Sequence, residues 1–256
     1  MTVDYNRIAD RFDERYQHVK YSGIHSQLRQ LIDHPGLDVL EVGCGTGHWL
    51  SVLSELGAHL LGADPSSAML YRARCRAPAA GLVCACAERL PFLRHSIDLI
   101  FCVNAFHHFS DPMRFLRDAR TLLRKTGRLA IFGLDPHVRE MNWYFYNYFS
   151  GLKEIDLRRF VPHQEIVCMM TEVGFHNVVT RPAERIQKTY FGEEVLADPF
   201  LDRASTSQLQ IISERTYKQG KRAIISQLKR AREAKNGTLS FVIDLPLFAT
   251  IGSQNN

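Results

Sequence analysis

The sequence predicts an α/β fold built on a doubly wound, mainly parallel sheet. Short apolar runs and amphipathic segments alternate five times between residues 38 and 132, as in folds that carry helices on both faces of a sheet. The first apolar run, with Val39, Leu40 and Val42, ends in a loop that has glycine at alternate positions. The chain has 256 residues, 45% of them hydrophobic, which is enough to form the core of one large domain.

The glycine loop is the candidate cofactor site. Residues 38–50 read DVLEVGCGTGHWL, a buried strand, a loop and the start of a helix, and glycines there allow a tight turn and close approach of backbone N–H groups to a ligand. A dinucleotide fingerprint would place its third glycine at the position of His48, and the Gly-Lys-Ser/Thr end of a P-loop is missing. Because Glu41 lies just before the first glycine, the loop favours a sulfonium ligand with an amino-acid tail over a pyrophosphate.

The segment EVGCGTG resembles the first motif of the class I S-adenosylmethionine-dependent methyltransferases. Within that class, the chain resembles the small-molecule branch (methyltransferase type 11, or UbiE-like). The resemblance implies a Rossmann-like, seven-stranded sheet of order 3-2-1-4-5-7-6, an N-terminal helical cap, and a helical insertion before the last strand. It implies S-adenosylmethionine as cofactor and S-adenosylhomocysteine as product.

Further cofactor contacts are expected at the ends of the next strands. Asp64 ends the apolar run 59–64, roughly 20 residues past the loop, where a carboxylate accepts hydrogen bonds from ribose hydroxyls; the alternative is a cap for the next helix. The resemblance also places the segment after the strand at 82–87 beside the adenine, although Glu88 could belong only to a surface turn. The predicted cofactor residues are Glu41, Gly43, Cys44, Gly45, Gly47, Asp64, Pro65, Ser66, Met69, Ala87, Glu88, Asn104 and Ala105.

Two adjacent histidines follow the fourth predicted strand, residues 97–103. Histidine titrates near neutral pH and can take a proton from a nucleophile, so His107 and His108 are the predicted catalytic residues. Adjacent side chains point in different directions. We therefore expect His108 to be the base or substrate-orienting group and His107 to pack under Phe106 or Phe109; the alternative is a purely structural pair. The Asn/Asp-Pro-Pro-aromatic motif of base-methylating enzymes is missing here.

Aromatic side chains gather in residues 141–149, MNWYFYNYF, a predicted helix. It is too aromatic to be an ordinary surface helix, so we expect a substrate wall; a core or dimer helix is the alternative. The opening segment, YxxIAxxFDxxY, resembles the cap of small-molecule methyltransferases, which folds over the cofactor, although a helix that only packs on the sheet would look the same. The predicted substrate residues are Tyr5, Tyr16, His108, Trp143, Tyr144, Tyr146 and Tyr148.

We expect one methyltransferase domain over residues 1–256. It divides into an N-terminal helical cap (1–34), a cofactor-binding core (35–182), a helical insertion (183–237) and a final strand with a tail (238–256). In the insertion the pattern predicts a helical hairpin broken at Gly220. The second of these helices is basic, which favours a solvated face over an RNA-binding one.

Composition narrows the function further. The formal charge of +5 is spread along the chain and is weak evidence for nucleic acid. The six cysteines lack the spaced pairs of a zinc site, so we predict no metal, reduced thiols and a cytoplasmic protein without a membrane span. The predicted function is methyl transfer to a small, hydrophobic or aromatic acceptor by a monomer or homodimer; a tRNA- or RNA-modifying methyltransferase and a non-catalytic S-adenosylmethionine-binding protein are the alternatives.

Overall fold

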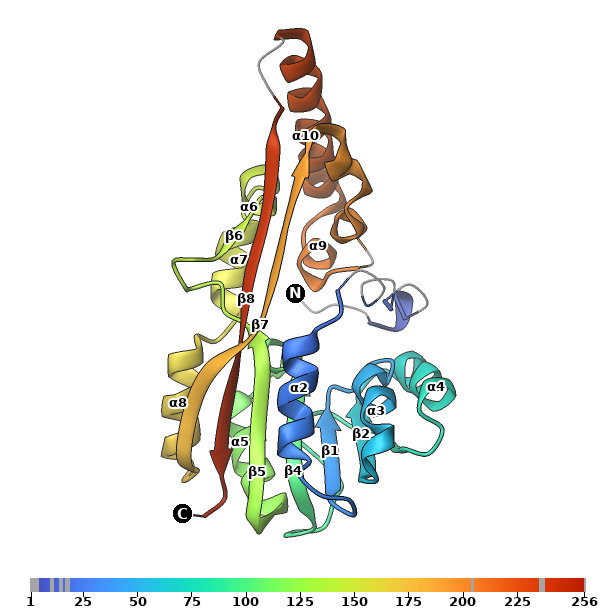
Figure 1. Ribbon diagram of the computed structural model, residues 1–256, viewed down its shortest axis with the longest axis vertical. Coiled ribbons are helices and arrows are strands. Elements are labelled where there is room, and N and C mark those ends of the chain that lie inside the picture. Colours follow the sequence, from blue (N-terminus) through green and yellow to red (C-terminus); the bar gives the residue numbers. More distant parts are fainter. Residues whose placement is uncertain are drawn as a thin grey trace.

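The computed structural model describes residues 5–9, 12–13, 16, 19–203, 205–234 and 238–255. A body containing the sheet carries an elongated arm, into which the two longest strands extend (Figure 1). The strands are β1 (Asp38–Val42), β2 (His59–Asp64), β3 (Gly81–Cys84), β4 (Ile97–Val103), β5 (Leu123–Leu134), β6 (Asn142–Trp143), β7 (His176–Phe191) and β8 (Ser240–Ser253). The α-helices are α2 (Ser22–Leu31), α3 (His48–Val52), α4 (Ser67–Arg76), α5 (Pro112–Leu122), α6 (Phe145–Tyr148), α7 (Leu152–Arg159), α8 (His163–Glu172), α9 (Ser207–Ile211) and α10 (Glu214–Ala234).

The sheet has the order β3-β2-β1-β4-β5-β8-β6, and β7 pairs with β8. Strands β1 to β5 pair in parallel, whereas β8 is antiparallel to both β5 and β7. With β8 as the seventh predicted strand and β7 as the sixth, the doubly wound order 3-2-1-4-5-7-6 is confirmed. The two-residue strand β6 is an addition that pairs with β8 beyond the end of β5.

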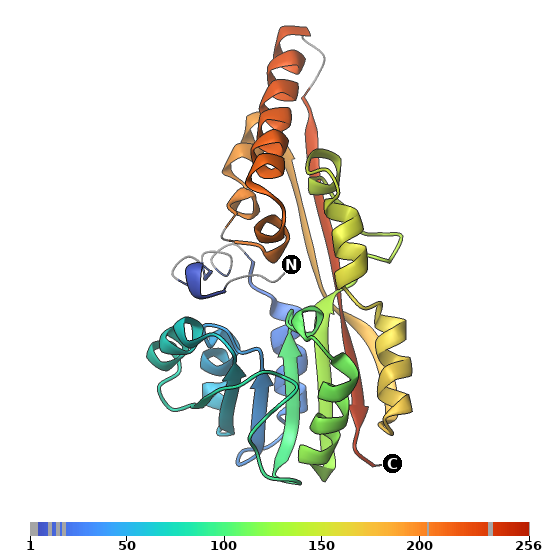
Figure 2. The same ribbon diagram turned by 180° about the vertical axis from the view of Figure 1, so that it is seen from behind.

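Helices cover both faces of the body sheet, with α2 and α3 on the face toward the viewer in Figure 1 and α5 and α8 on the face seen in Figure 2. Successive strand residues point to opposite faces, and both faces are buried. Val39 and Phe101 therefore lie in the apolar cluster beside α2, whereas Leu40 and Ile100 lie in the cluster under α5. This two-sided burial explains why the central strands read as continuous apolar runs.

The arm is formed by the far ends of β7 and β8 together with α6, α9 and α10 (Figures 1 and 2). The two strands pair from His176↔Ser253 to Phe191↔Ser240, with register shifts between His176 and Val179 and between Pro182 and Glu184. Within β8, alternate residues from Phe241 to Ala249 are buried, so one face of the ribbon supports the arm helices. The arm therefore extends the apolar interior well past the end of the body sheet.

Several element predictions are corrected by the structure. Residues 141–149 form the short strand β6 and one turn of helix α6, because Asn142 and Trp143 pair with Asp244 and Ile243 of β8. Residues 183–191 continue β7 and are not helical. Helix α10 runs unbroken through Gly220, where a Cβ atom would lie 2.3 Å from the ring of Phe149; this glycine permits close helix packing. The predicted N-terminal helix lies partly outside the described residues, and its described start is a 3₁₀ turn, Tyr5–Arg7.

Among the described residues, no helix has both the length and the apolar character needed to cross a bilayer.

Candidate active site

The glycine loop turns at the carboxyl end of β1 because its glycines adopt left-handed backbone angles. Gly43 and Gly47 have φ values of 75° and 74°, a region that other residues seldom adopt. A Cβ atom on Gly43 would lie 2.5 Å from the Cβ of Ala105, and one on Gly47 would lie 2.9 Å from the Cβ of Ala73. Two glycines of the loop therefore pack directly against Ala105 and Ala73. Gly45, between them in the sequence, faces a cavity.

Asp64, at the end of β2, holds this loop in place. Its Oδ2 accepts a hydrogen bond from the Gly45 N–H and its Oδ1 accepts one from the Ser66 N–H, both at 2.9 Å. Burial raises the pKa of Asp64 above its ordinary value, although the two N–H donors oppose that shift. Since each carboxylate oxygen can accept a second hydrogen bond, Asp64 retains acceptor capacity toward a ligand.

Glu41 is a buried carboxylate with an unsatisfied oxygen. Its side chain is 1% exposed, lines the same cavity, and has no hydrogen-bond partner for Oε2 among the described residues. Burial, and secondarily the charge of Asp64, raise the pKa of Glu41 well above its usual range. A cationic or hydroxyl-bearing ligand in the cavity would satisfy this oxygen.

The cavity above the loop has a volume of about 1200 Å³. It is bordered by the ends of β1, β2, β3 and β4 and by the N-terminal segment. Eleven of the thirteen predicted cofactor residues line it: Glu41, Gly43, Cys44, Gly45, Asp64, Pro65, Met69, Ala87, Glu88, Asn104 and Ala105.

The two remaining residues support this cavity from outside. Gly47 is the left-handed N-cap of α3. Ser66 caps α4 by accepting from the Met69 N–H at 3.2 Å. Glu88 also has a structural role, because its Oε1 accepts hydrogen bonds from Ser110 and from the Asp111 N–H. Burial opposes its ionisation, but these donors lower the pKa of Glu88.

Comparison with known proteins identifies the family. Residues 40–131, which include the loop and the cavity wall from β1 to β4, match the family described as Methyltransferase domain. The chain is therefore a methyltransferase that uses S-adenosylmethionine. A demethylmenaquinone methyltransferase of Thermotoga maritima is 29% identical over 67% of this chain and 86% of that protein.

Two solved structures share the fold of this methyltransferase. A protein of Anabaena variabilis, named as a methyltransferase of an antibiotic biosynthesis pathway, aligns over 89% of this chain and 96% of its own with a TM-score of 0.67 and 20% identity. A phosphoethanolamine N-methyltransferase 2 of Haemonchus contortus, solved with S-adenosylhomocysteine and phosphomonomethylethanolamine, aligns over 87% of this chain and 50% of its own with a TM-score of 0.54 and 17% identity.

The methyltransferase cavity fits S-adenosylmethionine by its own chemistry. The unsatisfied Oε2 of Glu41 suits the ammonium group of the methionyl part, and the remaining acceptor capacity of Asp64 suits the ribose hydroxyls. Met69 is 1% exposed and lines the cavity together with Phe109, and this apolar surface suits an adenine ring. Among the described residues, no cluster of three or more histidines, cysteines, aspartates or glutamates has the arrangement of a metal site.

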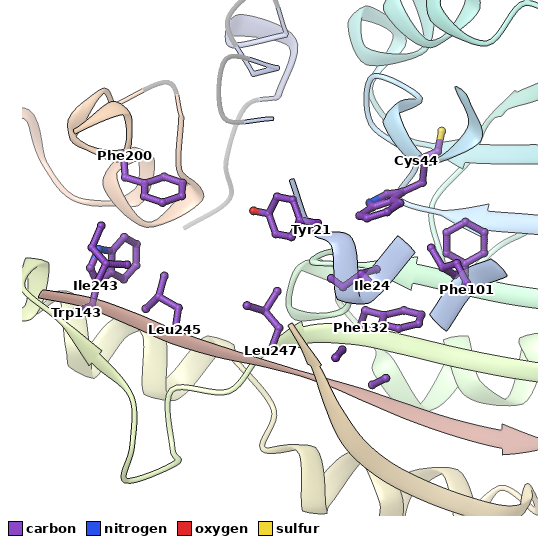
Figure 3. Close-up of a cluster of buried hydrophobic side chains, with 14 of the residues drawn as sticks. Tyr21, Ile24, Cys44, Phe101, Phe132, Trp143, Phe200, Ile243, Leu245 and Leu247 are labelled. Atoms are coloured by element: carbon purple, nitrogen blue, oxygen red, sulfur yellow. The ribbon is translucent and has the colours of Figure 1, made fainter. Parts of the chain in front are cut away.

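A second cavity, of about 650 Å³, adjoins the first and is here named the acceptor cavity. Four residues line both cavities: Tyr5, Phe12, Asn104 and His108. The far side of the acceptor cavity is formed by the arm, with Trp143, Phe200, Leu245 and Leu247. Figure 3 shows Leu247, Leu245 and Ile243 in a row along β8. Phe200, which belongs to the insertion, faces Trp143 and Ile243.

The two histidines differ in their surroundings. The Nε2 of His108 lies 2.6 Å from the hydroxyl of Tyr5, at the border between the two cavities. His107 stacks on Phe160, with ring centres 4.0 Å apart. It does not pack under Phe106 or Phe109, whose rings pack against Phe115. Asn104, directly after β4, has a φ of 51°, a conformation that asparagine tolerates better than most residues.

The structure separates the predicted aromatic residues. Trp143 lines the acceptor cavity and Tyr16 lines the cofactor cavity, where its ring stacks on His48 at 3.6 Å. The three tyrosines of the segment 141–149 direct their hydroxyls to partners elsewhere. Tyr144 donates to Asp198 at 2.6 Å, Tyr146 donates to Asp156 at 3.0 Å, and Tyr148 donates to Gln227. The pairing of β6 with β8 sets these directions.

Sequence reasoning missed much of the acceptor cavity. Phe160, Phe200, Leu245, Leu247 and the run 205–208 all line it. The alternation of apolar residues in LSFVIDLPLF could have pointed to one buried face of β8. No local pattern marks the others, since they come from the end of α7, from the 3₁₀ turn Pro199–Leu201 and from the start of α9.

Proposed function

We propose that this methyltransferase acts on a small acceptor with a hydrophobic or aromatic body, which binds in the acceptor cavity. Phe160, Phe200, Leu245 and Leu247 are each at most 8% exposed and form apolar walls. The direct border of the acceptor cavity with the cofactor cavity supports methyl transfer between the two bound molecules.

The observation that carries this proposal is the hydrogen bond between Tyr5 and His108 at the border of the cavities, 2.6 Å long. When bound, the cofactor supplies a methyl group on a positively charged sulfur, which departs as a neutral thioether. An acceptor that is a neutral hydroxyl or an acidic carbon loses a proton as it gains the methyl group. In our proposal that proton passes to the Tyr5 oxygen while the Tyr5 proton moves to Nε2 of His108, so that His108 is the final base.

The test is an acceptor screen followed by kinetics of histidine variants. Cell extract fractions are incubated with cofactor that carries an isotope-labelled methyl group, and labelled products are identified by mass spectrometry. With the acceptor in hand, His108→Asn should lower turnover by ~10²–10⁴-fold while S-adenosylhomocysteine binding and melting temperature are kept. His107→Asn should mainly lower stability, because it loses the stack on Phe160. Wild-type turnover by both variants would exclude a histidine base.

A small-molecule acceptor is favoured over nucleic acid by the placement of the basic residues. The cationic side chains of α10 line neither the cofactor nor the acceptor cavity. They are solvent-exposed along the arm: Lys218, Lys221, Arg222, Lys229, Arg230 and Arg232. We further infer a single domain with the divisions 1–34, 35–182, 183–237 and 238–256, acting in the cytoplasm as a monomer or homodimer.

A further inference from the structure

A half-buried arginine lies against the wall of the acceptor cavity. Arg159 is the last residue of α7, and its side chain is 16% exposed. Its Nη2 lies 3.4 Å from the Ser207 hydroxyl, and its Cζ lies 5.7 Å from the centre of the Phe160 ring. Since Ser207 and Phe160 both line the acceptor cavity, the guanidinium lies directly at that cavity's edge.

The guanidinium of Arg159 is poorly satisfied. It has five N–H donors, but within the described residues its hydrogen bonding amounts to the long contact with Ser207. Its Nη1 is buried and has no hydrogen-bond partner there. Burial lowers the pKa of Arg159, because a desolvated cation is unfavourable unless an anion or several acceptors compensate it.

The nearest carboxylate compensates this charge only in part. Asp156 Oδ1 lies 3.6 Å from Nη1 of Arg159 and makes no hydrogen bond among the described residues, while Oδ2 accepts from the Tyr146 hydroxyl at 3.0 Å. Burial raises the pKa of Asp156 to about 7, against the effects of Tyr146 and Arg159. This raised pKa weakens the compensation that the Asp156 carboxyl gives to the guanidinium charge.

Two further donors of the cavity wall are also unsatisfied. The Ser205 hydroxyl and the Trp143 indole N–H belong to residues that are 2% and 3% exposed and that line the acceptor cavity. Neither polar atom has a hydrogen-bond partner in the described part of the chain. Buried donors normally have partners, so the cavity wall has donors for which a bound molecule could supply the acceptors.

We propose that the methyl acceptor carries a carboxylate, and that Arg159 and Ser207 bind it where α7 and α9 meet the wall of the acceptor cavity. This inference rests on the proposed function. A planar guanidinium matches the two oxygens of a carboxylate, and one cation suits a monoanion better than a dianionic phosphate. The apolar walls of the acceptor cavity then hold the body of the substrate.

The test measures binding to the protein saturated with S-adenosylhomocysteine. The probes are hydroxyaryl and hydroxyalkyl carboxylates of increasing length, each paired with its neutral primary amide and with the corresponding phosphate monoester. We expect at least one carboxylate to bind tenfold or more tightly than both its amide and its phosphate partner. Arg159→Gln should abolish that preference, and Arg159→Lys should restore part of it. The matched control is Arg158→Gln, an exposed arginine on the same helix, which should keep the full preference.

Three results would overturn the inference: no carboxylate binds the wild-type protein, amides or phosphates bind as tightly as carboxylates, or Arg159→Gln keeps the preference. The wild-type comparison of carboxylate with amide does not depend on how any variant folds. Titration with S-adenosylhomocysteine separates the two proposals. A wild-type protein that fails to bind it contradicts the proposed function, whereas normal binding without carboxylate preference contradicts only this inference.

Discussion

Replacing Asp64 with asparagine probes the cofactor site at the point where the structure concentrates its hydrogen bonds. The two carboxylate oxygens accept the N–H groups of Gly45 and Ser66, each at 2.9 Å. An asparagine amide offers one oxygen and one NH₂ group, so one of the two N–H groups would face another donor. Losing a hydrogen bond to a charged group costs about 1.5–3 kcal/mol.

Both cofactor affinity and stability should respond to Asp64→Asn. The loop is displaced and a ribose acceptor is weakened, so S-adenosylhomocysteine binding measured by isothermal titration should fall ~10–100-fold, the equivalent of about 1.4–2.8 kcal/mol. The lost loop hydrogen bond should lower the melting temperature by several degrees, since about 1 kcal/mol corresponds to ~2–4 °C in a chain of this size.

Asp33→Asn is the matched control. Asp33 is 53% exposed and forms an ion pair with Arg128 at 3.1 Å. Neither Asp33 nor Arg128 lines the cofactor cavity or the acceptor cavity. It should leave S-adenosylhomocysteine affinity unchanged. If Asp64→Asn binds S-adenosylhomocysteine within twofold of the wild type, Asp64 neither holds the loop in its binding conformation nor contacts the ribose.

Three further predictions concern the loop, the buried carboxylate and the arm. Gly47→Ala should lower the melting temperature and weaken S-adenosylhomocysteine binding, because its Cβ would lie 2.9 Å from that of Ala73 at a φ of 74°; thermal unfolding and titration that match the wild type would contradict the close packing of α3 on α4. The pKa of Asp156 is raised to about 7 from an unfolded value of ~3.9, so the folded state holds this proton more tightly and stability decreases as pH rises from ~4 to 7. Melting curves at several pH values should show that decrease reduced in Asp156→Asn, and an identical pH slope in the two proteins would refute the assignment. Changing four exposed α10 cations together to glutamine should leave cofactor binding intact and bulk tRNA binding weak in a gel shift, whereas tight, salt-sensitive tRNA binding lost in the variant would favour an RNA substrate. The four are Lys221, Arg222, Lys229 and Arg230.

The features predicted correctly from sequence are those that short segments determine. The alternation of apolar runs gave the doubly wound sheet, because strands buried on both faces, such as β1 and β4, leave a continuous apolar signature. The apolar runs of the sequence predicted that Gly43 and Asp64 each follow or end a strand. The carboxyl ends of parallel strands meet at one edge of the sheet. Their proximity therefore follows from local pattern and topology together.

Other features depend on packing between distant segments. Tyr5 and His108 are 103 residues apart, and nothing in either local pattern predicts their contact. The segment 141–149 looked helical from its spacing, but pairing with β8 turned Trp143 into the acceptor cavity and Tyr146 toward Asp156.

The sequence by itself determined the sheet, the glycine loop and the position of the cofactor carboxylates, because hydrophobic periodicity and glycine backbone freedom act over a few residues. Only the tertiary structure decided which side chains form the acceptor cavity and where its charge lies. Arg159 reaches that cavity because α7 and α9, brought together by the arm, place its guanidinium beside Ser207. Side-chain direction on short, irregular elements depends on what packs against them, and that information is spread over the whole chain.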